Sequence, residues 1–463
     1  MLARMRALAV GILCALMAGC GGGGGDGPDP DRSSKKTPIK VWILDTEPER
    51  VQAARDIFAG FTRRSGIKVT LQALGDEGLA PRVARAAREG KLPDAIQLPM
   101  ASAHAYARQR ILNADAAQDV VRDLGEDTFS ARALSLLTSE GRVTAVPSDG
   151  WGQLLIYRKD LFDKAGLSAP RSLEDIRRAA RRLSTRGRAG ITLATGHDTF
   201  TAQSFEYVAL AAGCQLVDDA GEASLDSPAC ERAFALYTEL ARRYSPGGKQ
   251  DVDTTRDAYF AGRAAMILWS PFLLDAMAGL RDDAVPTCPE CRKDPAYLAR
   301  NSGLVGPLQE PGGEPTQFGE MSTWGITAGG KVGEASQFVE YMLTEGYVRW
   351  LGISPQGKYP LRFGVPEDPE RYVASWARLP SGVDRKAPLD RFYSQASIDS
   401  LGAGVRSLQR WGFEQGRAAL VGALREDEPV AGALAAEIRD GNGPEAAARQ
   451  AQAAVERLAK ATE

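Results

Sequence analysis

The stretch VPSDGWGQLLIYRKDLFDKAGL, residues 146–167, decides the fold. Its turn-forming residues 147–150 predict a loop, and Leu154–Tyr157 is an apolar run of the length of a short buried strand. Arg158 and the two residues after it interrupt that run, and apolar residues then recur at helical spacing up to Gly166. A loop, a strand, a turn and a helix in this order predict one unit of an α/β fold.

The composition is that of a globular protein that is too long for a single core. Of the 463 residues, 44% are hydrophobic and 25% are charged, and chains of this length divide into lobes of ordinary domain size. The formal charge of −2 lacks the basic excess of a nucleic-acid-binding protein, so no nucleic-acid partner is expected. Removal of the first 19 residues takes away Arg4 and Arg6 and no acid, which leaves 55 − 59 = −4.

The N-terminus predicts export and anchoring. Arg4 and Arg6 precede a short apolar stretch, residues 7–17, and Leu16-Met17-Ala18-Gly19-Cys20 resembles a bacterial lipobox. The resemblance implies a signal peptide over residues 1–19 and a lipid on the Cys20 thiol. The alternative is an ordinary signal peptide with an incidental cysteine. Residues 20–38 are glycine-rich and lack apolar side chains, which predicts a disordered tether. We therefore expect a lipoprotein at the outer face of the cell membrane or in the periplasm.

Four cysteines remain in the expected mature domain: Cys214, Cys230, Cys288 and Cys291. In an oxidising compartment they predict two disulfides, for which three pairings exist. Proximity in sequence favours Cys214 with Cys230 and Cys288 with Cys291. A half zinc site or a redox pair at Cys288-Pro-Glu-Cys291 is the alternative, but no second CxxC or suitably spaced histidine accompanies it. No metal and no cofactor are expected.

The first hundred residues of the domain alternate strand and helix patterns. Strands are predicted at 39–44, 67–71 and 93–98, and helices at 49–64, 79–88 and 101–109. This order predicts a parallel sheet covered by helices, with ligands bound at the carboxyl ends of its strands. That rule selects Asp45 and Thr46 after the first strand and Gln97 at the end of the third. Capping of the following helix is the alternative role for Asp45 and Thr46.

Several spaced motifs resemble family 1 extracellular solute-binding proteins, the sugar-binding receptors of ABC importers. Residues 146–167 resemble the family signature, although Arg158 occupies a position where Asn or Asp is usual. Residues 257–269 (DAYFAGRAAMILW), 332–344 (VGEASQFVEYMLT) and 357–362 (GKYPLR) resemble later segments in the same order. The resemblance covers most of residues 39–463.

This resemblance implies the type II periplasmic-binding-protein fold, with two lobes that each contain a mostly parallel sheet flanked by helices. We expect residues 39–145 plus about 303–360 in the N-terminal lobe. The C-terminal lobe then contains residues from about 146 to 302 together with residues 361–463, and hinge crossovers join the two lobes.

A sugar site needs planar hydrogen-bonding groups and aromatic faces that cover the C–H groups of the ring. Loop and strand-end positions supply both kinds of side chain. Burial in the core is the alternative for each tryptophan. The full set of expected ligand-binding residues is Asp45, Thr46, Gln97, Asp149, Trp151, His197, Asp198, Trp269, Ser322, Trp324 and Arg362.

The expected function is that of a lipid-anchored, monomeric receptor that binds a sugar or oligosaccharide between its lobes and closes by a hinge. The family resemblance implies that the closed form is delivered to the permease subunits of an ABC importer, without catalysis. Two alternatives remain. A carbohydrate-active hydrolase on the same tether lacks the usual catalytic motifs in this sequence, and a ligand-sensing lipoprotein that presents to a signalling partner cannot be separated from a receptor by sequence.

Overall fold

The computed structural model describes residues 37–75 and 78–462. The expected signal peptide and Cys20 lie outside this part of the chain. Residues from Thr37 onward form one compact unit. No helix within the described ranges is both long and apolar enough to cross a bilayer.

The larger sheet of the described chain has seven strands from both halves of the sequence, in the order β11-β6-β10-β3-β1-β2, with β14 paired to β10. β1 runs parallel to β2 and β3, whereas β10 runs antiparallel to β3 and β6. The bounds are β1 Ile39–Ile43, β2 Val69–Ala73, β3 Ala95–Pro99, β6 Val146–Gly152, β10 Gln317–Ile326, β11 Tyr359–Pro360 and β14 Leu408–Gln409.

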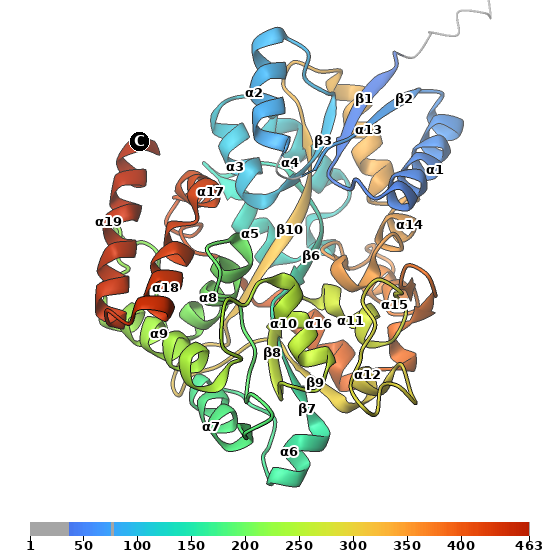
Figure 1. Cartoon of the computed structure of the whole chain (residues 1–463). Helices are drawn as coiled ribbons and strands as arrows, with labels where there is room; N and C mark the ends of the chain where they lie inside the picture. Colours follow the sequence, from blue (N-terminus) through green and yellow to red (C-terminus); the bar gives the residue numbers. More distant parts are fainter. Residues whose placement is uncertain (1–36, 76–77, 463) are drawn as a thin grey trace, which may run out of the picture. The chain divides into compact units, whose positions relative to one another are not determined.

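Helices cover both faces of this sheet (Figure 1). α1 (Pro48–Ser65) and α13 (Val332–Met342) share one face, where Phe58 and Phe61 meet Phe338 with ring centroids 4.8 and 5.4 Å apart. On the other face lie α2 (Leu79–Glu89) and α3 (Met100–Arg108). The six strands and helices predicted over residues 39–109 are confirmed to within two residues at each end.

A smaller sheet in the described chain has the order β8-β7-β9. Its strands are β7 (Leu154–Arg158), β8 (Met266–Trp269) and β9 (Ser302–Val305), and β7 is antiparallel to both neighbours. The segment around residues 189–192 makes only isolated parallel bridges to Ala264 and Ile267. The α/β class is confirmed, but the prediction of a mostly parallel sheet is wrong here, because both neighbours of β7 return to it through long connections and pair antiparallel to it.

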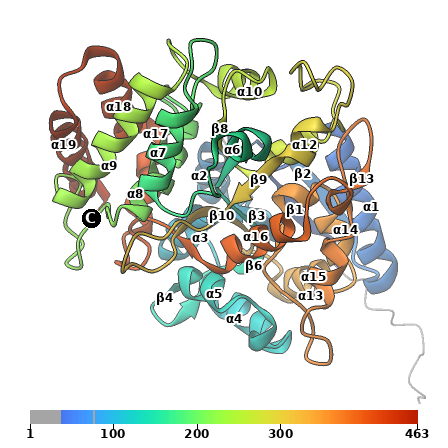
Figure 2. The same ribbon diagram turned by 90° about the horizontal axis from the view of Figure 1, so that it is seen from below.

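The helices around this smaller sheet are best seen in Figure 2. Ser172 caps α7 through a capping box with Asp175. The bounds are α6 Lys159–Ala165, α7 Leu173–Leu183, α8 Thr199–Ala211, α9 Pro228–Glu239, α10 Val252–Phe260, α11 Leu274–Met277 and α12 Tyr297–Asn301.

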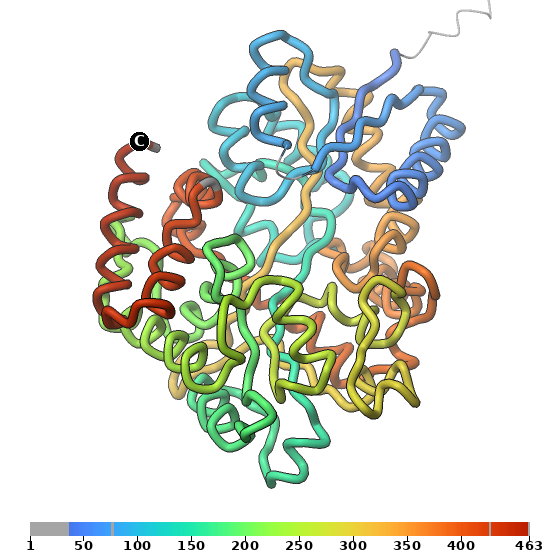
Figure 3. The backbone as a smooth tube through the Cα atoms, viewed as in Figure 1, coloured from blue at the N-terminus to red at the C-terminus, as the bar shows by residue number. Residues whose placement is uncertain are grey.

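The chain passes from the large sheet to the small one at Gln153, the single residue between β6 and β7. The predicted loop at residues 147–150 is therefore wrong, since these residues belong to β6. The Gln153 amide donates to the Phe318 carbonyl at 2.8 Å, and the Gln317 side chain donates to the Gln153 carbonyl. These bonds join the two crossing segments, which run side by side in Figure 3. The proposed lobe boundaries stay a prediction.

The C-terminal helices extend the packing around α8 and α9. α18 (Pro429–Asp440) and α19 (Pro444–Thr462) contact α9, and α17 (Ala418–Asp427) contacts both α19 and α3. The remaining elements include α4 Ala114–Asp123, α5 Ala131–Leu137, α14 Tyr347–Leu351, α15 Arg371–Trp376 and α16 Gln395–Arg406, with short strands β4 Thr138–Ser139, β5 Arg142–Val143, β12 Pro380–Ser381 and β13 Ala387–Pro388.

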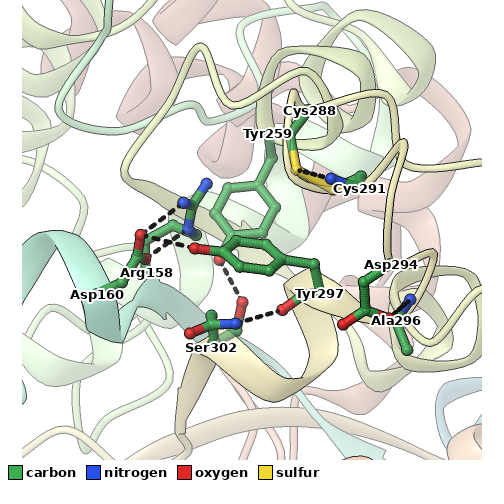
Figure 4. The surroundings of a disulfide bond; sticks show 10 residues. Arg158, Asp160, Tyr259, Cys288, Cys291, Asp294, Ala296, Tyr297 and Ser302 are labelled. Atoms are coloured by element: carbon green, nitrogen blue, oxygen red, sulfur yellow. Dashed lines mark hydrogen bonds and ion pairs between the residues drawn. A yellow bond between two sulfur atoms is a disulfide. The ribbon is translucent and has the colours of Figure 1, made fainter.

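Two disulfides join Cys214 to Cys230 and Cys288 to Cys291, the pairing that proximity in sequence favours. Figure 4 shows the second with the ion pair beside it. Arg158 is 4% exposed, and its guanidinium binds both carboxylate oxygens of Asp160 at 2.7 and 2.8 Å. The unusual arginine in the signature therefore has a local partner two residues later.

Candidate functional site

A cavity of about 280 Å³ opens at the carboxyl ends of β1 and β3. Five of the residues that the sequence selects line it together: Asp45, Gln97, Asp149, Trp151 and Ser322. They come from four strands or strand ends that are distant in sequence. The rule that ligand sites lie at the carboxyl edge of a parallel sheet explains this convergence.

Gln97 is fixed from both ends of its amide. Its Oε1 accepts from the Leu44 backbone amide at 3.0 Å, and its Nε2 donates to the Ser322 hydroxyl at 2.8 Å. Ser322 reaches this place because β10 pairs with β3 in antiparallel register, opposite Pro99. The pair presents a pre-oriented polar edge to the cavity.

Asp149 lies on β6 and is 2% exposed. Its Oδ2 accepts from the Ser148 hydroxyl at 2.7 Å and from the Trp350 indole N–H at 2.9 Å. The Lys358 ammonium lies 3.5 Å from Oδ1 of Asp149 and 3.8 Å from Oδ2 of Asp45. It also lies 4.5 Å from the centroid of a Trp350 ring. Lys358 therefore balances two carboxylates on one side of the cavity.

A second ion network reaches the cavity through Glu320. Arg410 binds Glu206 at 3.0 Å and Glu320 at 2.5 Å. Burial opposes the charge on Arg410, but Glu206 and Glu320 outweigh it and hold its pKa above the ordinary value. Burial raises the pKa of Glu206, against the influence of Arg410. The network fixes Glu320 on β10 at the edge of the cavity.

Two aromatic rings also line the cavity, beside these charged groups. Trp151 is half-buried, and Phe272 is 38% exposed, which is unusual for a phenylalanine in this fold. Their centroids lie 6.1 Å apart at an interplanar angle of 75°. A side chain at Gly357 would collide with Phe272, so the glycine permits the ring to approach this loop. The two rings offer apolar faces beside hydrogen-bonding groups.

Six residues with charged, amide or aromatic side chains outside the expected set also line the cavity: Arg50, Gln203, Phe272, Glu320, Lys358 and Arg425. Lys358 carried a signal, since it lies in the GKYPLR segment singled out above. Phe272 follows the strand that ends at Trp269, where a cavity-edge ring was expected. No local sequence pattern marks Glu320 or Arg425, because strand register and helix packing bring them to the cavity.

The other selected residues lie outside this cavity. Asp198 caps α8 by accepting from the Thr201 amide at 2.9 Å, and the His197 ring pairs with the Asp427 carbonyl at 2.7 Å. Trp269 is 8% exposed and packs on Phe200 with centroids 4.6 Å apart. Thr46 does not line the cavity. Glu47 occupies the N-cap position of α1, so the alternative capping role for Asp45 and Thr46 is wrong.

Trp324 and Arg362 are buried by neighbours that no local pattern reveals. Trp324 is fully buried under α13 and α14, against Phe338 and Trp350. Arg362 donates to the carbonyls of Leu124 and Leu343 at 2.8 Å each. These carbonyls end α4 and α13, where a cation is favoured by the helix dipole. Desolvation lowers the pKa of Arg362.

Among the described residues, no group of three or more His, Cys, Asp and Glu side chains is arranged to hold a metal ion. Cys288 and Cys291 are joined to each other.

Comparisons with known proteins agree with this geometry. Residues 45–349 match the bacterial extracellular solute-binding protein family. A putative ABC transporter periplasmic-binding protein of Escherichia coli, YcjN, is 26% identical over 365 residues, which are 76% of this chain and 78% of that protein.

Solved structures share the fold at low identity. The sugar-binding protein MalE from Xanthomonas citri superposes with a TM-score of 0.71 at 17% identity, over 92% of this chain and 98% of that one. The GacH receptor of Streptomyces glaucescens gives a TM-score of 0.68 at 19% identity, over 92% and 100%. The fold is that of the type II periplasmic binding proteins, and the chain belongs to the bacterial extracellular solute-binding protein family.

Proposed function

We propose that this protein is the receptor of an ABC importer and binds a neutral sugar or oligosaccharide in the cavity at the carboxyl edge of β1 and β3. The observation that carries the proposal is the pair of aromatic faces, Trp151 and Phe272, beside the fixed amide of Gln97. Aromatic faces suit the C–H groups of a sugar ring, and planar amides and carboxylates suit its hydroxyls.

The charges around the cavity support a neutral ligand. Asp45 pairs with Arg50 at 3.3 Å, and Lys358 lies between Asp45 and Asp149. Glu320 pairs with Arg410. An ionic ligand would have to displace one of these partners and leave a half-buried charge without compensation, which is costly. A neutral ligand with many hydroxyls can instead accept hydrogen bonds from the basic side chains and donate hydrogen bonds to the carboxylates. The ion pairs then stay intact.

The cavity wall contains side chains from several elements, which supports ligand-induced closure. Trp151 and Ser322 come from the large sheet, Phe272 follows β8 of the small sheet, and Gln203 belongs to α8. A ligand that contacts all of them shifts the population toward a closed state. The crossing segments at Gln153 and Gln317 are the proposed hinge, and the lobe boundaries given above belong to this proposal.

The relatives support the ligand class and the exported location. Solved structures with this fold include maltose-bound MalE3 of Thermotoga maritima and UgpB of Mycobacterium tuberculosis in complex with glycerophosphocholine. The fold thus serves solutes other than sugars, and the compensated charges of this cavity favour the sugar. Lipid anchoring through Cys20, the permease partners, the monomeric state and the absence of catalysis are parts of the same proposal.

A sugar panel tests the proposal on residues 20–463 carrying Cys20→Ser. Thermal unfolding and tryptophan fluorescence are measured with each mono- and oligosaccharide. A ligand present at a hundred times its Kd stabilises the fold by about 2.7 kcal/mol, which raises Tm by a few degrees. Recovery of the sugar unchanged supports a receptor, whereas hydrolysed product supports the alternative enzyme. A response to an anionic or cationic solute and to no neutral sugar contradicts the ligand class.

A further inference from the structure

The amino edge of the large sheet carries a concentration of positive charge that the ligand cavity does not use. Lys40 is the second residue of β1, Lys68 directly precedes β2, and Lys91 follows α2. All three side chains are exposed. The Ile39 amide donates to the Lys68 carbonyl at 2.9 Å, and the Asp94 amide to the Lys40 carbonyl at 2.8 Å, so these backbone segments are adjacent. We call this surface the basic edge.

Grooves on the two sides of β2 enlarge the basic edge. One groove, beside α1, is lined by Arg55, Arg63 and Lys68, and the other, beside α2, by Lys40, Arg82, Arg85 and Lys91. These 3 + 4 = 7 bases face one acid in the lining of the two grooves, Glu89, which pairs with Lys91 at 3.1 Å. Val69 and Leu71 of β2 line the groove beside α1, and Gln72 lines the groove beside α2; both helices are labelled in Figure 1. The whole chain has a net charge of −2, so this surface is a local excess.

The nearby carboxylate of Asp94 is 7% exposed and is occupied by backbone amides. Its Oδ2 accepts from the Lys40 amide at 2.7 Å, and its Oδ1 accepts from the Lys331 amide at 2.8 Å. The Lys331 ammonium donates to the Pro38 carbonyl, directly before β1. Asp94 therefore organises the amino edge of the sheet without covering the exposed lysine side chains.

The basic edge is also where the described domain begins. Cys20 and Thr37 are 17 residues apart in sequence, which spans at most about 60 Å even when fully extended. A lipid on Cys20 would therefore tether the domain to the bilayer through the chain that enters the domain at this edge. Anionic phospholipids attract clusters of lysine and arginine that come within about 10 Å of the surface.

We propose that the basic edge binds the anionic phospholipid surface of the membrane to which the protein is anchored. The proposal rests on the lipid anchor of the proposed function but not on its ligand. The cavity lies at the opposite, carboxyl edge of the same strands, so docking by the basic edge leaves the cavity accessible to solute. Docking holds the protein in a resting orientation by charge attraction, which salt weakens. The protein leaves the surface when it delivers its ligand.

Vesicle sedimentation tests the proposal with the unlipidated mature chain, residues 20–463 carrying Cys20→Ser. The probes are vesicles of phosphatidylcholine alone and vesicles that also contain phosphatidylglycerol. The chain is expected to bind the anionic vesicles and to be released when salt rises from about 50 to 500 mM. The triple variant Lys40→Gln, Lys68→Gln, Lys91→Gln should bind at least about tenfold more weakly.

A matched variant, Lys164→Gln, Lys249→Gln, Lys293→Gln, removes the same charge from exposed lysines elsewhere and should keep the binding. Equal loss in both triple variants overturns the proposal, as does equal binding of the parent chain to both kinds of vesicle. Retention on a soluble polyanion without binding to anionic vesicles also overturns it. The sugar-induced Tm shift is recorded for all three proteins, so failure of the ligand proposal is seen separately.

Discussion

Charged side chains have different surroundings at the two edges of the large sheet: they are buried and paired at one edge and exposed to water at the other. At the carboxyl edge, Lys358 is 6% exposed and lies within 4 Å of two carboxylates. At the amino edge, Lys40 and Lys68 are exposed to water, and their side chains need no such partners. The difference follows from solvation, since a buried charge must be compensated by the protein and an exposed charge is compensated by water. Charges at the cavity therefore contribute to folding, and charges at the basic edge remain available for a partner.

Removal of the buried ammonium should have the largest effect. Lys358→Met leaves Asp45 and Asp149 without their shared cation, and we expect a loss of about 3–5 kcal/mol in the free energy of unfolding. Urea denaturation measures it. The double variant Lys358→Met, Asp149→Asn removes an acid as well and should recover part of the loss. Equal stability of the single variant and the parent would contradict the comparison between the edges.

Asp275 is a buried carboxylate whose charge has poor compensation, so it tests the same rule for buried charges. It is fully buried beside the cavity wall, and the nearest arginine nitrogen, on Arg281, is 3.9 Å away. Burial raises the pKa of Asp275 to about 6, although Arg281 and the Ala276 amide act against this. The folded protein therefore binds a proton that the unfolded chain releases between about pH 4 and 6. The contribution of Asp275 to stability is present at pH 4 and is lost as the pH rises through 6.

Asp275→Asn should remove this pH dependence and raise stability at pH 7 by up to about 3 kcal/mol. The Gln356 side chain donates to Asp275 at 2.9 Å, and its Oε1 has no hydrogen-bond partner, so rotation of that amide can satisfy the new side chain. The free energy of unfolding, measured at pH 5 and pH 7.5, gives the slope of stability against pH. A variant that keeps the slope of the parent would assign the pH dependence to other groups.

The aromatic faces of the cavity should matter for affinity more than for folding. Trp151→Ala and Phe272→Ala each remove an apolar surface beside the ligand, and we expect Kd for the identified sugar to rise about ten- to thirtyfold. Titration calorimetry measures the change. Val285→Ala, at a side chain that is 49% exposed and does not line the cavity, is the control and should leave Kd unchanged. Unchanged affinity in both aromatic variants would place the ligand elsewhere.

The smallest effect on folding is expected at the basic edge. The triple variant Lys40→Gln, Lys68→Gln, Lys91→Gln should change the free energy of unfolding by less than about 0.5 kcal/mol, because exposed charges gain little from their surroundings. Urea denaturation beside Lys358→Met gives the contrast directly. A large loss in the triple variant would show that these lysines stabilise the sheet and are not reserved for a partner.

Local patterns were sufficient for the elements of residues 39–109 and for the cap of α7. The spacing of apolar residues in α1 fixes which side chains are buried, and Ser172 followed by Asp175 supplies its own capping partners. The same patterns placed Asp45 and Gln97 at one edge of the sheet, because parallel strands end together. They misjudged β6, where residues typical of turns are held in a strand by β10 and β11 on either side.

The sequence by itself determined the α/β class, the family resemblance, the cysteine pairs favoured by proximity and five residues of the cavity wall, because these depend on short-range spacing. Only the tertiary structure decided that Trp324 and Arg362 are buried and that Lys358, Phe272 and Glu320 face the cavity. Trp324 and Glu320, for example, lie on β10, which pairs with β3 and β6 from more than 150 residues away in sequence. Periodicity shows that a residue has a buried face, but the element that covers this face is chosen by long-range packing.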